Sequence, residues 1–405
     1  MQTPPVLPSG PSWRLFPYIS LYLTELKEQG FAKASFYERV YILKRLDRWL
    51  ERTGRDVHDL DESIAQEFLR RAITRDYGRN AGPATLRRLL AMLRRIGVTP
   101  EAKAPRPSPS ERLTHAYERF LLEERNLTPQ TVAQQRLTVR NFLSEKFDRG
   151  PLNLSKLRAP DVTTFVQRHA RDHGPFRARD LTTRIRQFLR YLHYKGLIDT
   201  DLSLAVPTVA CWSLSTLPKH LPPAQVRRIL RHCDQGLPLG RRNYAILLLL
   251  ARLGLRAGEV VRLNLEDIDW ESGLLTVHGK GKWAQLPMPA DAARAIARYL
   301  RRDRPQCACR RLFIRDHAPV DGLSCSHAIA NIVRGALAKA GVKSARKGAH
   351  LLRHSLATDM LRKGASLDEI GQVLRHSSPN TTAIYAKVDL DSLRPLALPW
   401  PGGAR

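Results

Sequence analysis

Cysteine is scarce in this sequence, which has only five among its 405 residues. So few thiols in so long a chain do not make a disulfide framework, and this favours a reducing compartment. Long apolar runs are also missing: the longest, from Ala245 to Ala251, is far shorter than the roughly 20 residues that span a bilayer. The first residues lack the basic and then apolar pattern of an export signal. We therefore expect a soluble, unexported, cytoplasmic protein with no membrane partner.

The cysteines offer one arrangement that could be taken for a metal site. Cys307 and Cys309 are followed by Cys325 and His327, which together supply four zinc-binding residue types. Zinc ligands of one motif are usually spaced more widely than the Cys307 and Cys309 pair. We therefore predict that the protein holds no metal and no other cofactor.

Acidic residues are too few to balance the basic ones. The chain has 67 lysines and arginines against 38 aspartates and glutamates, a formal net charge of +29. Such an excess is typical of proteins that bind a polyanion, and DNA is the expected partner. The alternative is that a GC-rich genome inflates the arginine content and that the charge only keeps the surface soluble.

Two stretches rich in proline, glycine and serine interrupt the periodic sequence, from Pro100 to Pro109 and from Val206 to Pro218. A chain of this length exceeds what one hydrophobic core usually supports, and stretches of this composition typically link domains. We expect a helical N-terminal domain over 1–108, a second helical domain over 109–205, a third domain over 217–392 and a C-terminal tail over 393–405.

The first two domains resemble each other in their apolar pattern. Matching positions lie 96 to 99 residues apart, in the pairs Ser35 and Thr131, Leu46 and Phe142, and Gly97 and Gly196. A slowly drifting offset predicts a duplicated unit of four or five helices. The alternative is that any two amphipathic bundles can be aligned in this way.

Basic residues crowd the last predicted helix of the second domain. Arginines at such positions can lie along a phosphate backbone or in a groove of DNA. Solvated helix faces rich in arginine are also common, so each residue has a plain surface interpretation as well. The candidates for DNA contact are Arg177, Arg179, Arg184, Arg186 and Arg190.

The third domain mixes helices and strands. Two short strands, Leu274 to Val277 and Trp283 to Met288, are joined by a turn whose glycines permit positive φ. Helices are predicted from Pro223, over Arg242 to Leu253, from Ala257, and over Ala328 to Gly341, Leu351 to Lys363 and Leu367 to Leu374. The whole chain is thus expected to be mainly α, with a small antiparallel β-sheet in the C-terminal domain.

Four small groups of residues in the third domain have chemically useful side chains. Taken singly, each also has a plain structural interpretation, such as a buried ion pair or a polar turn. The groups are Arg256 with Glu259 one helical turn later, Lys280 and Lys282 in the turn, His350 three residues before Arg353 on one helix face, and His376 separated from Tyr385 by a predicted loop.

In this order the four groups resemble the active site of the tyrosine recombinases, also called the phage integrase family. The matching segments are LGLRAGEVVRL, TVHGKGKWAQLPMP, HLLRHSLAT and LRHSSPNTTAIYAKV. The resemblance covers the third domain and, more weakly, the second, which is similar to the family's core-binding, SAM-like domain. It implies helical N-terminal and core-binding domains followed by the α+β catalytic domain, with double-stranded DNA as the partner.

The resemblance also implies the reaction and its residues. Tyr385 is the expected nucleophile, and a 3′-phosphotyrosyl intermediate keeps the bond energy, so rejoining needs no ATP. His350 is the preferred acceptor of the phenolic proton, and no divalent metal is expected because no carboxylate cluster accompanies these groups. The implied catalytic set is Arg256, Lys280, His350, Arg353, His376 and Tyr385, with Lys282, also a candidate DNA contact, as the fallback for Lys280.

The family acts as a tetramer on paired DNA sites through a Holliday junction, and accessory recombinases are further possible partners. The extended chain favours a recombinase of a mobile element, associated with the nucleoid when bound to DNA. The alternatives are a type IB topoisomerase, and a non-catalytic DNA-binding or architectural protein that would lack at least one catalytic residue. The domain over 1–108 is open between a second DNA clamp, an arm-site binding module and a contact surface for another recombinase.

The sequence departs from the family pattern in two places. Arg375 stands where a glycine usually precedes the second histidine. The preceding helix is therefore expected to lose its left-handed cap, at a cost of up to roughly 1 kcal/mol unless it closes in another way. Leu351 and Leu352 replace the usual Asp-Leu pair between the first histidine and its arginine. Neither change removes a catalytic group.

Overall fold

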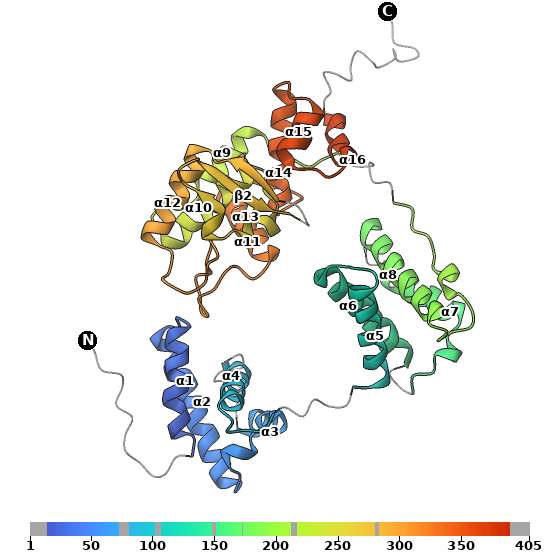
Figure 1. Cartoon of the computed structure of the whole chain (residues 1–405), viewed down its shortest axis with the longest axis vertical. Helices are drawn as coiled ribbons and strands as arrows, with labels where there is room; N and C mark the ends of the chain where they lie inside the picture. The colour runs from blue at the N-terminus through green and yellow to red at the C-terminus, as the bar shows by residue number, and fades with distance from the viewer. Residues whose placement is uncertain are drawn as a thin grey trace, which may run out of the picture. The chain divides into compact units, whose positions relative to one another are not determined.

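The computed structural model describes residues 14–72, 81–101, 107–147, 151–171, 173–211, 217–279 and 283–388 (Figure 1). The chain divides into two compact units, one made of residues 1–101 and 216–405 and the other of residues 102–215. Both unit limits fall in or next to the two proline-rich stretches. None of the helices in the described ranges is long and apolar enough to cross a membrane.

The N-terminal helices enclose a core of their own. Leu43, Phe68 and Leu89 are fully buried there, and Asp47 accepts a hydrogen bond of 2.9 Å from the backbone N–H of Leu15. That bond accounts for a carboxylate inside an otherwise apolar core, because a buried acceptor needs a donor. The elements are α1 (Phe16–Glu28), α2 (Lys33–Arg52), the 3-10 helix η1 (Val57–Asp59), α3 (Glu62–Ala72) and α4 (Ala81–Arg95).

The second compact unit has the same order of elements. Its first helix starts at a capping box, in which the Ser108 hydroxyl accepts from the Glu111 N–H and the Glu111 carboxylate accepts from the Ser108 N–H. Tyr117, Phe142 and Phe188 lie at the centre of its aromatic core. The elements are α5 (Pro109–Glu123), α6 (Pro129–Phe147), η2 (Leu154–Lys156), α7 (Ala159–Arg171), α8 (Pro175–Tyr194) and η3 (Leu202–Ala205).

The C-terminal segment forms around one central helix, α10 (Pro238–Arg252). Six consecutive residues of α10, from Ala245 to Leu250, have no exposed surface, so the helix is buried on all sides. It packs against α12 and α14 within one large hydrophobic core. The surrounding helices are α9 (Pro223–Arg231), α11 (Ala257–Arg262), α12 (Ala290–Arg302), α13 (Ser326–Lys339) and α14 (Ala349–Arg362).

One small antiparallel sheet lies in this segment, in the order β1-β2-β3. The strands are β1 (Ile268–Asp269), which follows the 3-10 helix η4 (Leu265–Asp267), β2 (Leu274–His278) and β3 (Trp283–Pro287). Thr276 pairs with Gln285 and His278 with Trp283, so β2 and β3 form the predicted hairpin. The prediction of a mainly helical chain with a small antiparallel sheet is confirmed.

The last described elements are α15 (Leu367–Leu374), α16 (Pro379–Thr382) and the 3-10 helix η5 (Ala383–Val388). They form a small core with α14, in which Ala357, Ile370, Leu374 and Tyr385 are buried. The predicted loop between His376 and Tyr385 was wrong, since α16 and the start of η5 occupy that stretch. Pro379 is suited to the first turn of a helix and starts α16.

Candidate active site

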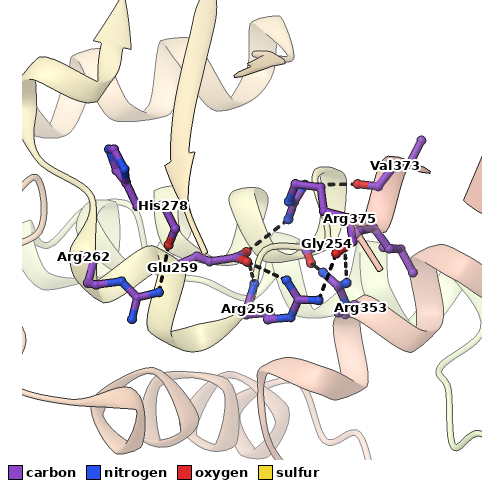
Figure 2. Close-up of polar contacts among 9 residues, drawn as sticks. Gly254, Arg256, Glu259, Arg262, His278, Arg353, Val373 and Arg375 are labelled. Carbon is purple, nitrogen blue, oxygen red and sulfur yellow. Dashed lines mark hydrogen bonds and ion pairs between the residues drawn. The ribbon is translucent and has the colours of Figure 1, made fainter. Parts of the chain in front are cut away.

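Arg353 is the buried centre of the candidate site. It lies on α14 and is 3% exposed. Its Nη1 donates to the carbonyl oxygen of Gly254 at 2.5 Å, and its Nη2 donates to the carbonyl oxygen of Leu374. Burial, followed by the charge of Arg256, lowers the pKa of Arg353 to about 10, so the guanidinium remains charged at neutral pH. Arg353 therefore joins the chain just after α10 to the end of α15 (Figure 2).

Gly254 makes this close approach possible. Its φ is +57°, a left-handed conformation that side chains disfavour. A Cβ at this position would lie 2.7 Å from Cδ2 of Leu374 and 3.1 Å from Cδ2 of Leu356. The glycine lets the chain leave α10 sharply while α14 and α15 pack against it, and the next helix, α11, then starts directly after its N-cap, Arg256.

Arg256 and Glu259 form the ion pair that their spacing predicted. Arg256 is the N-cap of α11, and its backbone N–H donates to Oε2 of Glu259 at 2.8 Å. Nη1 of Arg256 donates to Oε1 of the same carboxylate, also at 2.8 Å. Glu259 is 2% exposed. Burial alone would raise its pKa, but the hydrogen bonds from Arg256 and the charge of Arg375 lower the pKa below its usual value.

The expected loss of the left-handed cap before His376 was wrong. Arg375 itself takes the left-handed conformation, with φ 55° and ψ 50°. Its N–H donates to the Gln372 carbonyl at 3.0 Å, and the His376 N–H donates to the Gly371 carbonyl at 2.9 Å. These two bonds form a Schellman motif, which normally uses glycine. Helix α15 thus keeps its cap with an arginine in the glycine position.

His376 follows this cap at once. Its Nδ1 lies 2.7 Å from Oγ1 of Thr382 on α16, which fixes the ring. Burial, followed by the charges of Arg353 and Arg256, lowers the pKa of His376 to about 4. The imidazole is therefore neutral at physiological pH and lies stacked beside Tyr385, with 6.5 Å between the ring centroids.

Tyr385 is buried in this structure, with 1% of its surface exposed. Its hydroxyl lies 2.8 Å from Nδ1 of His354, a residue that the sequence did not single out. Burial raises the pKa of Tyr385 to about 12 and lowers the pKa of His354 to about 4. The bond therefore joins a neutral imidazole to a protonated phenol.

The other predicted residues have different positions. The ring centroid of His350 lies 6.3 Å from that of His354, and burial lowers its pKa, as do the charges of Arg353 and Arg256. Lys280 and Lys282 lie outside the described residues, as does the tail over 393–405. The structure thus brings together five of the six predicted catalytic side chains and leaves the lysine undescribed.

The candidate DNA-contact arginines of α8 differ in their surroundings. Arg177 and Arg184 line a groove of about 430 Å³ together with Gln134 and Asn141 of α6. Arg186 instead donates to the carbonyl oxygens of Val206 and Pro207 at 3.0 and 3.4 Å, a structural role. Arg179 lies over the Phe176 ring and Arg190 is exposed. Two of the five therefore face a cavity.

The described residues contain no group of side chains suited to hold a metal ion. No cluster there brings together three or more histidine, cysteine, aspartate or glutamate side chains that could hold an ion. Cys307 and Cys309 are half-buried thiols with no disulfide bond, and Cys325 is exposed.

Comparison with solved structures identifies the fold. The XerH site-specific recombinase, crystallised with its palindromic difH substrate as a post-cleavage complex, matches with a TM-score of 0.56 at 18% identity. The match covers 72% of this chain and 97% of that one. The fold is that of the tyrosine recombinases.

Comparison of sequences identifies the family. The candidate integrase/recombinase y4rA of Sinorhizobium fredii (strain NBRC 101917 / NGR234) is 45% identical over 390 residues, which cover 96% of this chain and 95% of that protein. The tyrosine recombinase XerD of Mycobacterium tuberculosis (strain ATCC 25618 / H37Rv) is 31% identical over 300 residues, 69% of this chain and 93% of that protein. The sequence model of the family described as "Phage integrase family" matches residues 219–391. The chain belongs to the phage integrase family of tyrosine recombinases and is a DNA recombinase.

Proposed function

We propose that this recombinase cleaves and rejoins DNA strands through a covalent bond to Tyr385. The supporting observation is the convergence of three further segments on Arg353 of α14: the start of α11, the end of α15 and the 3-10 helix η5. They bring two guanidiniums, three imidazoles and one phenol into one cluster. Such a cluster suits phosphoryl transfer, in which positioning and charge stabilisation do most of the work.

The proposed cleavage step balances without any co-reactant. Oη of Tyr385 attacks the phosphorus, and the bond from phosphorus to the 5′-oxygen breaks, leaving a 3′-phosphotyrosyl and a free 5′-hydroxyl. The energy of the broken ester is kept in the new one, so the hydroxyl of the partner strand can reverse the step without ATP. Repetition on the second pair of strands resolves a Holliday junction.

The two arginines are proposed to hold the non-bridging oxygens of the phosphate. A planar guanidinium can donate two parallel hydrogen bonds to such oxygens, where negative charge grows in the transition state. His376 can add a further hydrogen bond. Each preorganised donor of this kind is commonly worth a factor of about 100 to 1,000 in rate.

The proton of the phenol needs an acceptor near the phosphate. The charges that lower the pKa of His350 come mainly from Arg353 and Arg256, the two groups proposed to hold the phosphate. We therefore keep His350 as the proposed acceptor, and assign to His354 the task of holding Tyr385 where it lies now. Lys280, with Lys282 as its fallback, is proposed to protonate the leaving 5′-oxygen, because lysine is the ammonium that shifts its pKa most readily.

Neither a divalent metal nor ATP enters this proposal. The charged groups proposed to meet the phosphate, Arg256, Arg353 and Lys280, are cations, whereas two-metal nucleases hold their ions with carboxylates. Glu259, the nearby acid, already accepts hydrogen bonds from Arg256 and Arg375 through both of its oxygens. Its lone pairs are therefore largely occupied by protein donors.

We propose that the helical domains and the catalytic domain all bind double-stranded DNA. The groove between α6 and α8 is lined by Arg177 and Arg184 with the amides of Gln134 and Asn141, a mixture that suits phosphate contact and base readout. The related XerH recombinase is described as bound to its difH substrate. We propose domains over 1–108, 109–205 and 217–392, with the tail over 393–405 docking on a neighbouring subunit.

The assembly is proposed to be a tetramer on two DNA sites, with or without an accessory recombinase, acting in the cytoplasm for a mobile element. The long N-terminal segment and the integrase/recombinase description of the y4rA relative support that setting. A type IB topoisomerase would instead act as a monomer on one duplex.

The decisive experiment uses a nicked suicide duplex built from the DNA that flanks the chain's own gene. We expect the native chain to form a covalent protein–DNA adduct in the presence of EDTA, and Tyr385→Phe to form none while still binding the duplex. Peptide mapping should place the adduct on Tyr385. Binding without any adduct would contradict the catalytic proposal, and an adduct that needs a divalent cation would contradict metal independence.

A further inference from the structure

Arg375 is a residue whose presence the fold makes costly. It has a positive φ at the C-terminal cap of α15, a conformation that costs a side chain about 1 kcal/mol or more. Glycine would fill the same cap freely. An arginine here must therefore gain something from its side chain that offsets the backbone strain.

The side chain of Arg375 reaches the carboxylate of Glu259. Nη2 of Arg375 lies 3.1 Å from Oε2 of Glu259, and the two side chains are 13% and 2% exposed. Arg256 donates to that carboxylate from the other direction at 2.8 Å. Nη2 of Arg256 also donates to the backbone carbonyl of Arg375 at 3.2 Å, which closes a ring of contacts (Figure 2).

This ring joins two parts of the site that are far apart in the sequence. One side of it is the first turn of α11, which presents Arg256. The other side is the residue immediately before His376. The carboxylate is shared between two guanidiniums, so Arg256 is not fully neutralised by Glu259 and keeps positive charge for a phosphate.

We propose that Arg375 is a positioning residue of the strand-cleavage reaction, which acts through Glu259 to fix Arg256 against the segment that carries His376. This inference rests on the proposed function. Arg375 does not need to touch the DNA in this role. Its contribution is the geometry and charge of the groups that do, and displacement by a fraction of an ångström is costly in such sites.

The test replaces Arg375 by the glycine that fits its backbone. Arg375→Gly keeps the cap of α15, so the variant is expected to fold. Adduct formation under single-turnover conditions should slow by about 10- to 100-fold, while the affinity for the uncleaved duplex changes little. Arg375→Lys, which keeps the charge, should recover part of the rate.

The pH profile separates positioning from a merely structural role. Loss of the Arg375 charge removes one of the causes that lower the pKa of Glu259, so Glu259 should protonate at a higher pH and release Arg256. The acidic limb of the pH–rate profile for cleavage should therefore shift to higher pH in Arg375→Gly. In Arg375→Lys it should return toward the native position. The matched control is Arg241→Ala, which breaks a pair of similar burial, 15% and 3% exposed, with Asp303. Its pH profile should stay that of the native chain.

Two results would overturn the inference, and they are distinguishable. An active native chain with an Arg375→Gly variant of equal rate and equal pH profile would overturn the role of Arg375 alone. A native chain that binds the suicide duplex and forms no adduct would overturn the proposed function and this inference with it.

A second inference comes from the outer face of α2 in the N-terminal helices. Tyr37 and Tyr41 are 68% and 45% exposed, and Arg45 lies over the Tyr41 ring at 5.8 Å. Arg48 and Arg52 continue the same stripe, because residues four apart lie on one helix face. Arg45, Arg48 and Arg52 also line a groove of about 360 Å³ with Glu51.

The sequence offset between the two helical segments makes residues of this stripe correspond to residues that line the groove between α6 and α8. At the offset of 96 residues, Tyr41 corresponds to Leu137 and Arg45 to Asn141, and both of the latter line the groove between α6 and α8. Guanidiniums beside exposed aromatic rings are a combination that tracks a nucleic-acid backbone. We infer that the α2 face binds the phosphate backbone of duplex DNA that flanks the cleavage site.

Salt dependence tests this second inference. Each lost phosphate contact should reduce the slope of log K against log salt by roughly 0.9. With a duplex that extends beyond the cleavage site, Arg48→Gln/Arg52→Gln should therefore lower the slope by up to roughly 1.8. The control is Arg70→Gln/Arg71→Gln, which removes two exposed charges from α3.

Arg48→Gln/Arg52→Gln should leave binding to the minimal cleavage-site duplex unchanged. Equal slopes for native and variant chains on the longer duplex would overturn the inference. So would a change confined to self-association in sedimentation, which would assign the α2 face to a protein partner instead of DNA.

Discussion

Nδ1 of His354 lies 2.8 Å from the hydroxyl oxygen of Tyr385. The low pKa of His354 keeps its imidazole neutral at physiological pH. Burial holds the pKa of Tyr385 at about 12, so the proposed nucleophile is protonated and shielded from solvent.

The two imidazoles of α14 should therefore respond differently to replacement. His350→Gln should slow adduct formation by about 100-fold or more, the usual contribution of a general base. His354→Gln should slow it less and should leave Tyr385 more accessible, which tetranitromethane nitration of Tyr385 followed by mass spectrometry can measure. If His354→Gln slows cleavage as much as His350→Gln does, the proton acceptor is His354.

Stability should fall with acidity because His354 and His376 are buried as neutral imidazoles. The pKa values of His354 and His376 are each about 4 in the folded chain, against about 6.5 in an unfolded one. Between these values the unfolded chain binds more protons, so the free energy of unfolding is highest above pH of about 6.5 and declines toward pH of about 4.

Thermal unfolding at a series of pH values checks this expectation. His354→Gln/His376→Gln should show a flatter decline of Tm with falling pH than the native chain. His327→Gln, at an exposed position on α13, is the control and should follow the native curve. A double variant that loses Tm as steeply as the native chain would show that other groups cause the acid sensitivity.

Gly254 should tolerate no side chain. Gly254→Ala places a Cβ 2.7 Å from Leu374 at a positive φ, whereas Gly273→Ala has the same kind of φ and nothing within 4 Å. Both substitutions incur backbone strain, and Gly254→Ala should cost about 1 to 3 kcal/mol more than the control. Urea unfolding measures the difference. Equal losses would mean that the Leu374 methyl group moves aside freely.

Replacement of the two proposed catalytic arginines should affect stability and activity to different extents. Arg353→Ala leaves the carbonyls of Gly254 and Leu374 without their donor in a buried place, which should cost about 2 to 5 kcal/mol. Arg256 is 38% exposed, and Arg256→Ala should cost less, by unfolding in urea. Both variants should lose adduct formation. Equal destabilisation by the two would argue that Arg353 has no special structural role.

Replacement of Arg184 should affect DNA binding, whereas replacement of Arg186 should affect stability, although both arginines lie on α8. Arg184→Ala, in the groove, should weaken duplex binding and leave the folding of the unit intact. Arg186→Ala should lower its thermal stability, because the Val206 and Pro207 carbonyls lose a donor. Fluorescence anisotropy on a labelled duplex and Tm measurements together check both. Loss of binding in Arg186→Ala at native stability would reverse the two roles.

Most of the fold in the C-terminal segment followed from local patterns. The α10 run of apolar residues and the glycines predicted in the hairpin turn each specify an element by short-range chemistry. Helix α12 was missed, although Ala292, Ala295, Ile296 and Tyr299 are buried at helical spacing. Small alanine side chains weaken the apolar signal there, so the stripe is visible only once its neighbours are known.

The site was predictable as a set of residues and unpredictable as a set of contacts. The Arg256 and Glu259 pair follows from helix spacing, since both partners lie on one turn. The partners of His354 and Arg375 lie 31 and 116 residues away, and no local pattern encodes such distances. The left-handed cap was misjudged for a related reason: a glycine preference is a local rule, and a distant carboxylate overrode it.

The contacts of Arg353 also bear on when the enzyme becomes active during synthesis. Its guanidinium bonds to carbonyls 99 residues upstream and 21 residues downstream. The first bond can form only after Arg353 has left the ribosome and the second only after Leu374 has, and Tyr385 emerges later still. If the proposed mechanism holds, a chain that ends before Tyr385 should have no assembled strand-cutting centre and should not nick DNA.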